Sequence, residues 1–522
     1  MQLIPAAVIR KLYNRTSLRN ADGGVRFSVK NRLSPATLKR VDRVVLNGDE
    51  IALAKVSMSV DGSAPIRLDA LADGVDLEFA LGTLLGFHLD IAPLHEGEHT
   101  LELAFSTEPF GTLKLEIKDG LKSSDHDADS IPRDVENDYS DEVIRARQAF
   151  VRERSDGDPK HLFEYSFDAD ETRGNIEHFT GVAQVPVGIA GPIHVRGQHA
   201  DGEFYVPLAT TEGTLVASYN RGMKVVAECG GVKCAVVGDN MQRAPVFIFA
   251  DAQTARRFCD WIVEKDAEIK QVCAETDPFV RLKYVDYYLA NKFAFLRFNF
   301  TTGDAAGMNM VGKATFAACN WILQNCNDIE IERFFLESNF ATDKKASNIN
   351  MMRTRGKRVT AEVLIRRQVL ADIMDADTES LYAHYKVATI GSMLSGAINN
   401  GCHSANAITA LFLATGQDVA NVSESSAALL YSELTPEKDL YMSITLPSLI
   451  VATCGGGTGL PTQRESLELL GCYGPGKVMK FAEIVAGTVL AGEISLAAAI
   501  SSLDWVSSHD QYGRNDPLAA AS

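Results

Sequence analysis

The sequence predicts an α+β fold in three parts: an all-β N-terminal module, a large mixed domain, and a small unit inserted into that domain. Three observations lead to this prediction. Residues 1–121 form short runs in which apolar and polar side chains alternate, whereas residues 122–141 are acidic and aperiodic. From residue 142 onward, helical periodicities alternate with glycine-rich loops. The length of 522 residues is also more than one hydrophobic core usually supports.

The N-terminal module is predicted to be a small β-sandwich. Alternation with a period of two places one face of a strand against a core and the other face in water. Turn-forming pairs such as Asn47-Gly48 and Asp61-Gly62 separate the runs. The predicted strands are residues 25–30, 41–46, 54–60, 75–79, 99–105 and 112–117. We end this domain, whose role the sequence does not indicate, at residue 121 and assign 122–141 to an acidic linker.

The inserted unit is predicted from the order of its elements. Asp251 can cap a helix whose apolar side chains repeat at helical spacing, and a second helix is centred on Ala314 and Ala317. The apolar runs that predict strands are residues 246–249, 280–285, 293–298 and 331–336. The order β-α-β-β-α-β is that of a split βαβ, ferredoxin-like unit. We therefore assign residues 245–336 to the insertion, and 142–244 with 337–522 to the large domain.

Composition and charge limit the classes of partner. The chain is 46% hydrophobic and 23% charged, as in ordinary soluble proteins. Its 51 basic and 68 acidic side chains give a formal net charge of -17, which argues against nucleic acid or an anionic membrane as a partner. The N-terminus lacks the long apolar stretch of a signal peptide, and all nine cysteines lie at or after Cys229 without a CxxC pair. These features predict a cytoplasmic protein with free thiols.

Two further patterns suggest a membrane span and a metal site, and neither is convincing. The long apolar stretch at residues 481–503 contains Glu483 and Glu493, so it predicts a buried helix rather than a membrane span. His95 and His99 have a helical spacing, but Gly97 between them indicates a turn, and there is no HExxH motif. We therefore predict no metal site.

Two glycine-rich turns are candidate ligand sites. Residues 303–307 lie between a predicted strand and a predicted helix, where backbone N–H groups at the helix N-terminus can bind phosphate. The alternative is an ordinary tight turn, because the GxGxxG fingerprint is absent. Residues 453–459 contain three consecutive glycines. Such a loop either packs closely against a ligand or another backbone, or serves as a flexible hinge.

Four ionisable residues are candidates for chemistry. Glu212 follows Thr210 and Thr211, either of which can cap the next helix; it is then a surface carboxylate in the first turn, or, if buried, a proton donor. Lys344 lies in a polar loop and can stabilise a developing negative charge. Asp418 follows the helix predicted over 404–414, where Gly416 can end it. His509, near the C-terminus, can protonate a leaving group.

Seven motifs, in this order, resemble those of the hydroxymethylglutaryl-CoA reductase family. The resemblance covers about residues 177–514, and GDAAGMNM is closer to the eukaryotic-type class than to the typical bacterial class. The motifs are VPVGIAGP at 185–192, LATTEGTLVASYNRG at 208–222, GDAAGMNM at 303–310, ATDKKASNIN at 341–350, ANAITALFLATGQD at 405–418, GGGT at 455–458, and SSH at 507–509 followed by Arg514.

The resemblance implies that the thioester hydroxymethylglutaryl-CoA is reduced twice, giving mevalonate and CoA for isoprenoid synthesis. It implies NADPH as the cofactor, with NADH as an open alternative. It implies that Lys344 stabilises the oxyanion, Glu212 supplies a proton, and Asp418 lies between them. By the same resemblance, His509 protonates the departing thiolate.

Binding roles and assembly also follow from the resemblance. It implies a homodimer, or a dimer of dimers, with active sites shared between subunits. The residues that match cofactor-binding positions are Asp304, Gly307, Met308, Asn309 and Arg514. Those that match substrate-binding positions are Arg243, Asn339, Asp343, Lys345, Asn406, Ser218 and Arg221.

The sequence departs from the family pattern at four positions. Glu337 replaces the usual serine two residues before Asn339, and His178 replaces an asparagine in the ENVIG-like segment. Ala306 and Cys454 are the other two departures. Two alternative functions therefore stay open: a reductase of a related acyl-CoA thioester, and a non-catalytic binding or scaffold protein on the same fold.

Overall fold

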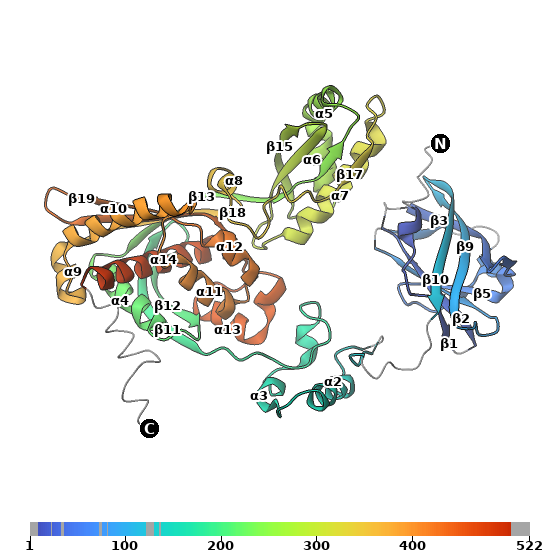
Figure 1. The fold of residues 1–522 in the computed structure, drawn as a ribbon, viewed down its shortest axis with the longest axis horizontal. Helices are drawn as coiled ribbons and strands as arrows, with labels where there is room; N and C mark the ends of the chain where they lie inside the picture. Colours follow the sequence, from blue (N-terminus) through green and yellow to red (C-terminus); the bar gives the residue numbers. More distant parts are fainter. Residues whose placement is uncertain are drawn as a thin grey trace. The chain divides into compact units, whose positions relative to one another are not determined.

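The computed structural model describes residues 9–21, 23–32, 36–71, 76–80, 82–121, 130–134 and 137–502 (Figure 1). The chain divides into two compact units, Met1–Ser130 and Ile131–Ser522. Unit 1 is an antiparallel β-sandwich, whereas unit 2 combines a large mixed domain with the inserted unit.

The N-terminal unit contains two five-stranded antiparallel sheets, ordered β1-β2-β8-β5-β6 and β10-β9-β3-β4 with β7 beside β3. Side chains from both sheets share one core, in which Phe27 stacks on Phe87 with ring centroids 4.9 Å apart. The strands are β1 Arg19–Ala21, β2 Gly24–Lys30, β3 Ala36–Leu46, β4 Asp49–Glu50, β5 Val56–Val60, β6 Ile66–Arg67, β7 Leu77–Phe79, β8 Leu84–Leu89, β9 Gly97–Glu108 and β10 Gly111–Leu121. Three 3-10 helices accompany them: η1 Arg10–Leu12, η2 Leu53–Lys55 and η3 Leu68–Leu71.

The predicted sandwich is confirmed, but one of its central strands was missed. Strand β8, Leu84–Leu89, lies between β2 and β5 in the first sheet. Its inward residues Leu85, Phe87 and Leu89 are buried. Its other face carries Leu84 and Gly86, with His88 as its one polar residue, so the alternation that marks a half-buried strand is weak in the sequence.

In unit 2, the large domain is built on a sheet ordered β12-β11-β13-β18-β20-β19. Only the β11–β13 pair is parallel among these neighbours. The strands are β11 Val187–Gly197, β12 Asp201–Ala209, β13 Val232–Arg243, β18 Gly356–Ile365, β19 Leu429–Leu434 and β20 Leu440–Leu449. The helices are α2 Asp141–Glu153, α3 Lys160–Phe163, α4 Leu215–Glu228, α8 Asn348–Arg353, α9 Arg367–Met374, α10 Thr378–Ser395, α11 Ser404–Thr415, α12 Val422–Ser425, α13 Pro461–Leu469 and α14 Val478–Ser501, with 3-10 helices η4 Ala169–Thr172, η5 Val419–Asn421 and η6 Gly456–Gly459.

Helix α14 lies in the core of this domain and contacts α4, α11 and the sheet (Figure 1). It is the one described helix that is long and apolar enough to cross a membrane, but 78% of its most apolar window is buried within the protein. Its two carboxylates are paired: Glu483 accepts backbone N–H groups of the β11–β12 turn, and Glu493 accepts those of Cys402 and His403. The prediction of a buried helix is confirmed.

The inserted unit has the predicted split βαβ topology. Its sheet is antiparallel in the order β17-β14-β16-β15, and β16 also pairs with β13 of the large domain. The Asp251 side chain caps α5 by accepting the N–H of Thr254 at 2.7 Å, as predicted. The elements are β14 Val246–Ile248, α5 Ala252–Glu264, α6 Asp266–Ala274, β15 Arg281–Ala290, β16 Phe293–Thr301, α7 Met308–Asn325 and β17 Arg333–Phe335. Helix α6 was not predicted, since only Ile269 and Cys273 of its residues are buried.

Candidate active site

Lys344 and Asp418 come together from distant parts of the sequence. Lys344 lies in the loop between β17 and α8, and its Nζ is 3.1 Å from Asp418 Oδ2. Asp418 directly follows α11 and caps η5 by accepting the N–H of Ala420. Both side chains are partly exposed, at 45% and 35%, so a ligand can reach the pair. A partly exposed ammonium held by a carboxylate suits the stabilisation of a developing oxyanion.

Glu212 lies beside Asn406. Asn406 Nδ2 donates to the two carboxylate oxygens of Glu212, at 3.1 and 3.4 Å. Glu212 is exposed and precedes α4, which begins at Leu215 after Thr214 in the left-handed region. The prediction that Thr210 or Thr211 caps this helix with Glu212 in its first turn was therefore wrong.

The predicted Lys-Asp-Glu cluster is only partly assembled within this chain. Helix α11 carries Asn406 near its N-terminus, and Asp418 follows its C-terminus. The Glu212–Asn406 and Lys344–Asp418 pairs thus lie towards opposite ends of one helix. Within the described ranges, no hydrogen bond or ion pair joins the two pairs.

The triple-glycine loop packs against the end of α11. A Cβ on Gly416, which has a φ of 68°, would lie 2.2 Å from the carbonyl oxygen of Gly457. A Cβ on Gly457 would lie 2.7 Å from the carbonyl oxygen of Gly416. Contact with another backbone, rather than a flexible hinge, therefore explains these glycines, and it places Asp418 two residues beyond the contact.

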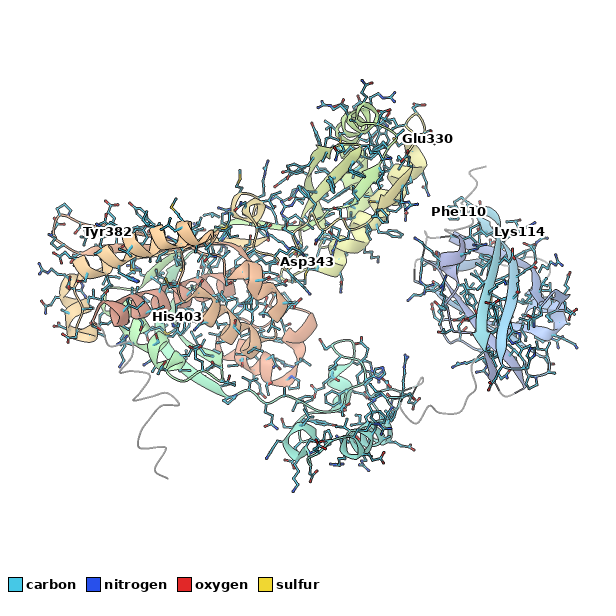
Figure 2. All side chains as sticks on the ribbon, in the orientation of Figure 1. Phe110, Lys114, Glu330, Asp343, Tyr382 and His403 are labelled. Carbon is cyan, nitrogen blue, oxygen red and sulfur yellow. The ribbon has the colours of Figure 1, made fainter. Side chains whose placement is uncertain are left out.

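The Lys344 loop contains several residues predicted to bind substrate. Asn339, Thr342 and Lys344 all have positive φ angles, which residues other than glycine rarely adopt. Lys345 Nζ donates to the carbonyl of Asp343 at 2.9 Å. Asp343, labelled in Figure 2, lies where the inserted unit joins the large domain.

Arg243 already has an internal partner. Its Nη1 lies 3.0 Å from Glu337 Oε2, and its Nη2 donates to the carbonyl of Met308 at 2.9 Å. Glu337 Oε1 also accepts the N–H of Asn339 at 2.8 Å. The unusual glutamate at position 337 therefore neutralises an arginine that was predicted to bind substrate.

The GDAAGMNM turn suits a phosphorylated cofactor. Gly307 has a φ of 77°, and a Cβ there would lie 2.3 Å from the Thr302 side chain. As the N-cap of the 18-residue helix α7, it provides no side-chain cap. The helix dipole and the free N–H groups of the first turn, at Met308 and Asn309, favour an anion such as a phosphate.

Asp304, in the same turn, contacts the large domain. Its carboxylate accepts the backbone N–H groups of Gly476, Lys477 and Val478 at 2.9, 3.0 and 3.1 Å. It thereby caps the N-terminus of α14. The structure thus gives Asp304 a capping role, and its predicted contact with the cofactor stays a prediction.

Ser218 and Arg221 both contact Ser495 of α14. Ser218 Oγ is 3.0 Å from Ser495 Oγ, and Arg221 Nη2 donates to the Ser495 carbonyl at 3.1 Å. Ser218 also lies 3.5 Å from Nε2 of His403, a buried histidine stacked on Tyr219. Burial lowers the pKa of His403 to about 4, so this imidazole is neutral at physiological pH. The sequence did not single out His403, because a lone histidine belongs to no recognisable motif.

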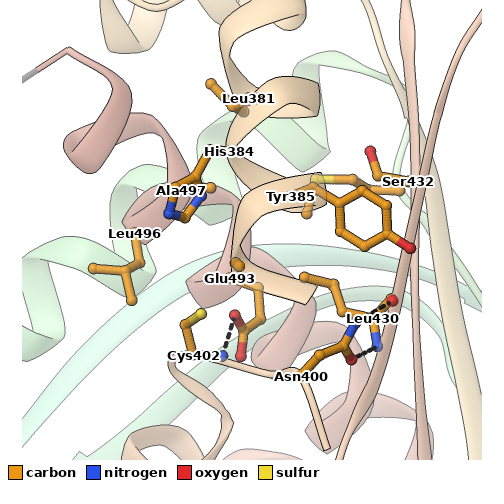
Figure 3. Close-up of a pocket in the computed structure, with 12 residues that line it drawn as sticks. Leu381, His384, Tyr385, Asn400, Cys402, Leu430, Ser432, Glu493, Leu496 and Ala497 are labelled. Atoms are coloured by element: carbon orange, nitrogen blue, oxygen red, sulfur yellow. Dashed lines mark hydrogen bonds between the residues drawn. The ribbon is translucent and has the colours of Figure 1, made fainter. Parts of the chain in front are cut away.

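A small cavity of about 20 Å³ lies between α10, β19 and α14 (Figure 3). Glu493, Cys402 and His384 line it together with apolar side chains. Its volume is enough for a water molecule but not for a substrate.

His509 and Arg514 lie outside the described residues.

A lysine–aspartate pair and a turn suited to a phosphorylated cofactor fit the class of oxidoreductases that reduce a carbonyl with a nucleotide cofactor, and the comparisons with known proteins assign the chain to that class. The family model described as hydroxymethylglutaryl-coenzyme A reductase matches residues 143–514, and the model of that enzyme's N-terminal domain matches residues 8–122. The chain belongs to the hydroxymethylglutaryl-CoA reductase family.

Individual relatives agree with this assignment. The chain is 41% identical over 363 residues to the 3-hydroxy-3-methylglutaryl-coenzyme A reductase of Pyrococcus abyssi, covering 68% of this chain and 88% of that protein. It is 40% identical over 377 residues to that of Methanothermobacter thermautotrophicus, covering 72% and 94%. The class II enzyme of Streptococcus pneumoniae, solved with NADPH, shares the fold with a TM-score of 0.51 at 21% identity, covering 63% of this chain and 79% of that one.

Proposed function

We propose that this chain reduces hydroxymethylglutaryl-CoA to mevalonate and free CoA, using two NADPH, in the mevalonate pathway. The observation that carries the proposal is the Lys344–Asp418 contact, which lies within the region of the family match. The thioester carbon takes up a hydride and its oxygen a proton, giving a hemithioacetal. Its C–S bond then breaks as the hydroxyl group loses a proton and the departing thiolate gains one. The resulting aldehyde takes up a second hydride and proton, so two protons are consumed.

The proposed cofactor site is the N-terminus of α7. Two NADPH molecules, bound one after the other, would each supply one hydride. Because Gly307 has no Cβ, the turn can pack closely against Thr302. The N–H groups of Met308 and Asn309 would hold the phosphates of the cofactor. Asp304 holds this turn against α14, and Arg514 is proposed to bind the same cofactor.

Four residues are proposed to act in catalysis, each with a separate role. Lys344 stabilises the oxyanion as the thioester is reduced, and Asp418 holds its ammonium group. Glu212 is exposed and lies at the other end of α11 from Lys344, so we propose that it donates the proton to the carbonyl oxygen in an active site shared between two subunits. His509 is proposed to protonate the departing CoA thiolate.

The proposed substrate site joins the cofactor turn to the Lys344 loop. Arg243 contacts both Met308 and Glu337, so it lies between the two. Asn406 orients Glu212 through the hydrogen bonds to its carboxylate. The remaining substrate-binding residues are proposed to be Ser218, Arg221, Asn339, Asp343 and Lys345.

A kinetic assay tests this function. The purified chain is expected to oxidise NADPH when given hydroxymethylglutaryl-CoA, releasing one CoA thiol for every two NADPH consumed. Lys344→Ala removes the oxyanion donor and is expected to lower kcat by about 10²–10³. Lys270→Ala, which removes a half-buried lysine paired with Asp266 in the inserted unit, should leave kcat unchanged.

The same assay tests the cofactor and the acyl group. NADPH is expected to give a higher kcat/KM than NADH, and hydroxymethylglutaryl-CoA a higher one than other acyl-CoA esters. Absence of oxidation with either nicotinamide cofactor would contradict the proposed reaction. Preference for a different acyl-CoA would contradict the proposed substrate.

We further propose that two copies form a dimer through α10. This helix exposes Val387, Ile390, Met393 and Leu394, each between 56% and 83% accessible. Tyr431 of β19 extends this apolar face, with its ring 6.4 Å from that of Tyr385 on α10. A second copy would bury this surface.

Light scattering after gel filtration tests the assembly. The unchanged chain is expected to have the mass of a dimer or of a dimer of dimers, and Leu394→Lys to shift it towards a monomer and lower activity. Val263→Lys, at a similarly exposed residue of α5, should change neither. A monomeric mass for the unchanged chain would contradict the dimer.

We place the enzyme in the cytoplasm, since all nine of its cysteines are free thiols.

A further inference from the structure

We infer that Glu424, a residue of α12 outside the proposed reaction, is a positioning residue that holds the Lys344 loop in its working conformation through a buried ion network with Arg355. This inference rests on the proposed role of Lys344. It concerns a side chain that cannot touch the substrate, since Glu424 is fully buried.

The network is centred on one guanidinium group. The Arg355 side chain is 0% exposed, and its Nε lies 3.2 and 3.4 Å from the two carboxylate oxygens of Glu424. Its Nη2 donates to Asp343 Oδ1 at 2.6 Å, and its Nη1 donates to the carbonyl of Gln242 at 3.2 Å. Arg355 thus links α12 to the residue immediately before Lys344.

Glu424 also acts on the lysine loop through Arg355. The guanidinium that its carboxylate pairs with also holds Asp343, the residue before Lys344. Lys344 has a φ of 58°, a conformation that persists only when surrounding contacts hold it. The Glu424–Arg355–Asp343 network provides such a restraint next to the residue that carries the catalytic ammonium group.

One short helical segment therefore acts on the lysine loop at two points. Asp418 caps η5, and α12 follows directly and carries Glu424. Asp418 pairs with the Lys344 ammonium group, and Glu424 pairs with the Arg355 guanidinium that holds Asp343. The two carboxylates together restrict where the side chain of Lys344 can reach.

Few charged groups face Glu424, so its own charge decides whether the network is fully ionic. Arg355 attracts its carboxylate, and Asp343 repels it. Of the elements packed against α12, α11 has no charged side chain, and β20 has only Tyr441, whose hydroxyl bonds Glu362. Burial raises the pKa of Glu424 to about 7, so the fully ionic network forms as pH rises through neutrality.

The test compares Glu424→Gln with Glu483→Gln, a matched change at another fully buried glutamate that accepts backbone N–H groups away from the lysine loop. Glu424→Gln is expected to lower kcat about 10- to 100-fold while KM changes less than about twofold, because a displaced donor affects the transition state. The wild-type rise of kcat with pH near neutrality should disappear in Glu424→Gln and persist in Glu483→Gln.

A second measurement does not require activity, and its wild-type arm does not require a folded variant. An amine-acylating reagent followed by mass spectrometry reports the reactivity of Lys344, with the adjacent Lys345 as an internal reference. In the wild-type protein the Lys344-to-Lys345 ratio should fall as pH rises through about 7, because the ionised network holds the Lys344 ammonium against Asp418. In Glu424→Gln the ratio should stay high at every pH.

The outcomes separate the two proposals. If the wild-type protein does not reduce the thioester, the proposed function fails, while the labelling ratio still tests the network. If the wild-type enzyme is active but Glu424→Gln retains its kcat and pH profile, the positioning role is wrong. A wild-type labelling ratio that is constant across neutral pH, or equal kinetic losses in both variants, would also overturn it.

Discussion

At the scale of single residues, the proposed active site depends on backbone conformations that cost free energy. A non-glycine residue in the left-handed region costs about 1 kcal/mol or more, and Lys344 is one of three such residues in its loop. The sequence predicted that a lysine in a polar loop stabilises negative charge. It contained no sign of the positive φ, nor of Arg355 and Glu424, since their importance arises only from contacts with the loop.

Glu337 is expected to weaken substrate binding by occupying Arg243. Glu337→Gln keeps an acceptor for the N–H of Asn339 but removes the charge that pairs with the guanidinium. We expect KM for hydroxymethylglutaryl-CoA to fall about threefold to tenfold, a modest change because the pair is partly exposed. Kinetics at low and high salt measure this effect.

The matched control is Glu332→Gln, which breaks an exposed pair with Lys292 in the same part of the chain. KM should stay unchanged in that variant. An unchanged or raised KM in Glu337→Gln would show that Glu337 does not compete with the substrate for Arg243.

At the scale of elements, local signals located most helices and strands but not all of their ends. Gly416 ends α11 in the left-handed conformation, as predicted, because the glycine signal is local. The predicted cap of α4 was wrong, because the chain makes an extra turn at Thr214 that presents Glu212 to Asn406. A threonine does occupy the N-cap, but it is Thr214, in the left-handed region and without a side-chain cap.

The contact between α11 and the triple-glycine loop is expected to be sensitive to one methyl group. Gly416→Ala places a Cβ 2.2 Å from a backbone oxygen and strains a positive φ, so we expect a loss of about 1–3 kcal/mol in the free energy of unfolding. Gly459→Ala, in the same loop but with open space around its Cβ, should cost much less. Thermal and urea denaturation of both variants check this, and equal losses would contradict the close packing.

At the scale of the whole molecule, the chain builds separate cores. The N-terminal sandwich has its own core, which contains no residue of unit 2, and the large domain packs around α14. The inserted unit adds a third core, in which phenylalanines pack among aliphatic and cysteine side chains. Units with independent cores can fold independently.

Removal of the N-terminal unit tests this independence. A chain of Ile131–Ser522 retains every proposed catalytic and binding residue, so we expect it to fold cooperatively and to keep its kcat and KM. Circular dichroism and the NADPH assay measure these properties. A truncated chain that folds but loses activity would assign the sandwich a part in catalysis.

The sequence by itself determined the class of most elements, the β-α-β-β-α-β order of the inserted unit and the family, because periodicity, turn residues and motifs are local features. Only the tertiary structure decided the partners of each charge. It joined Lys344 to Asp418, placed Glu212 beside Asn406, and paired Arg243 with Glu337. The physical reason is that ion pairs and hydrogen bonds depend on distances of a few ångströms, and residues far apart in the chain reach such distances only once the elements have packed.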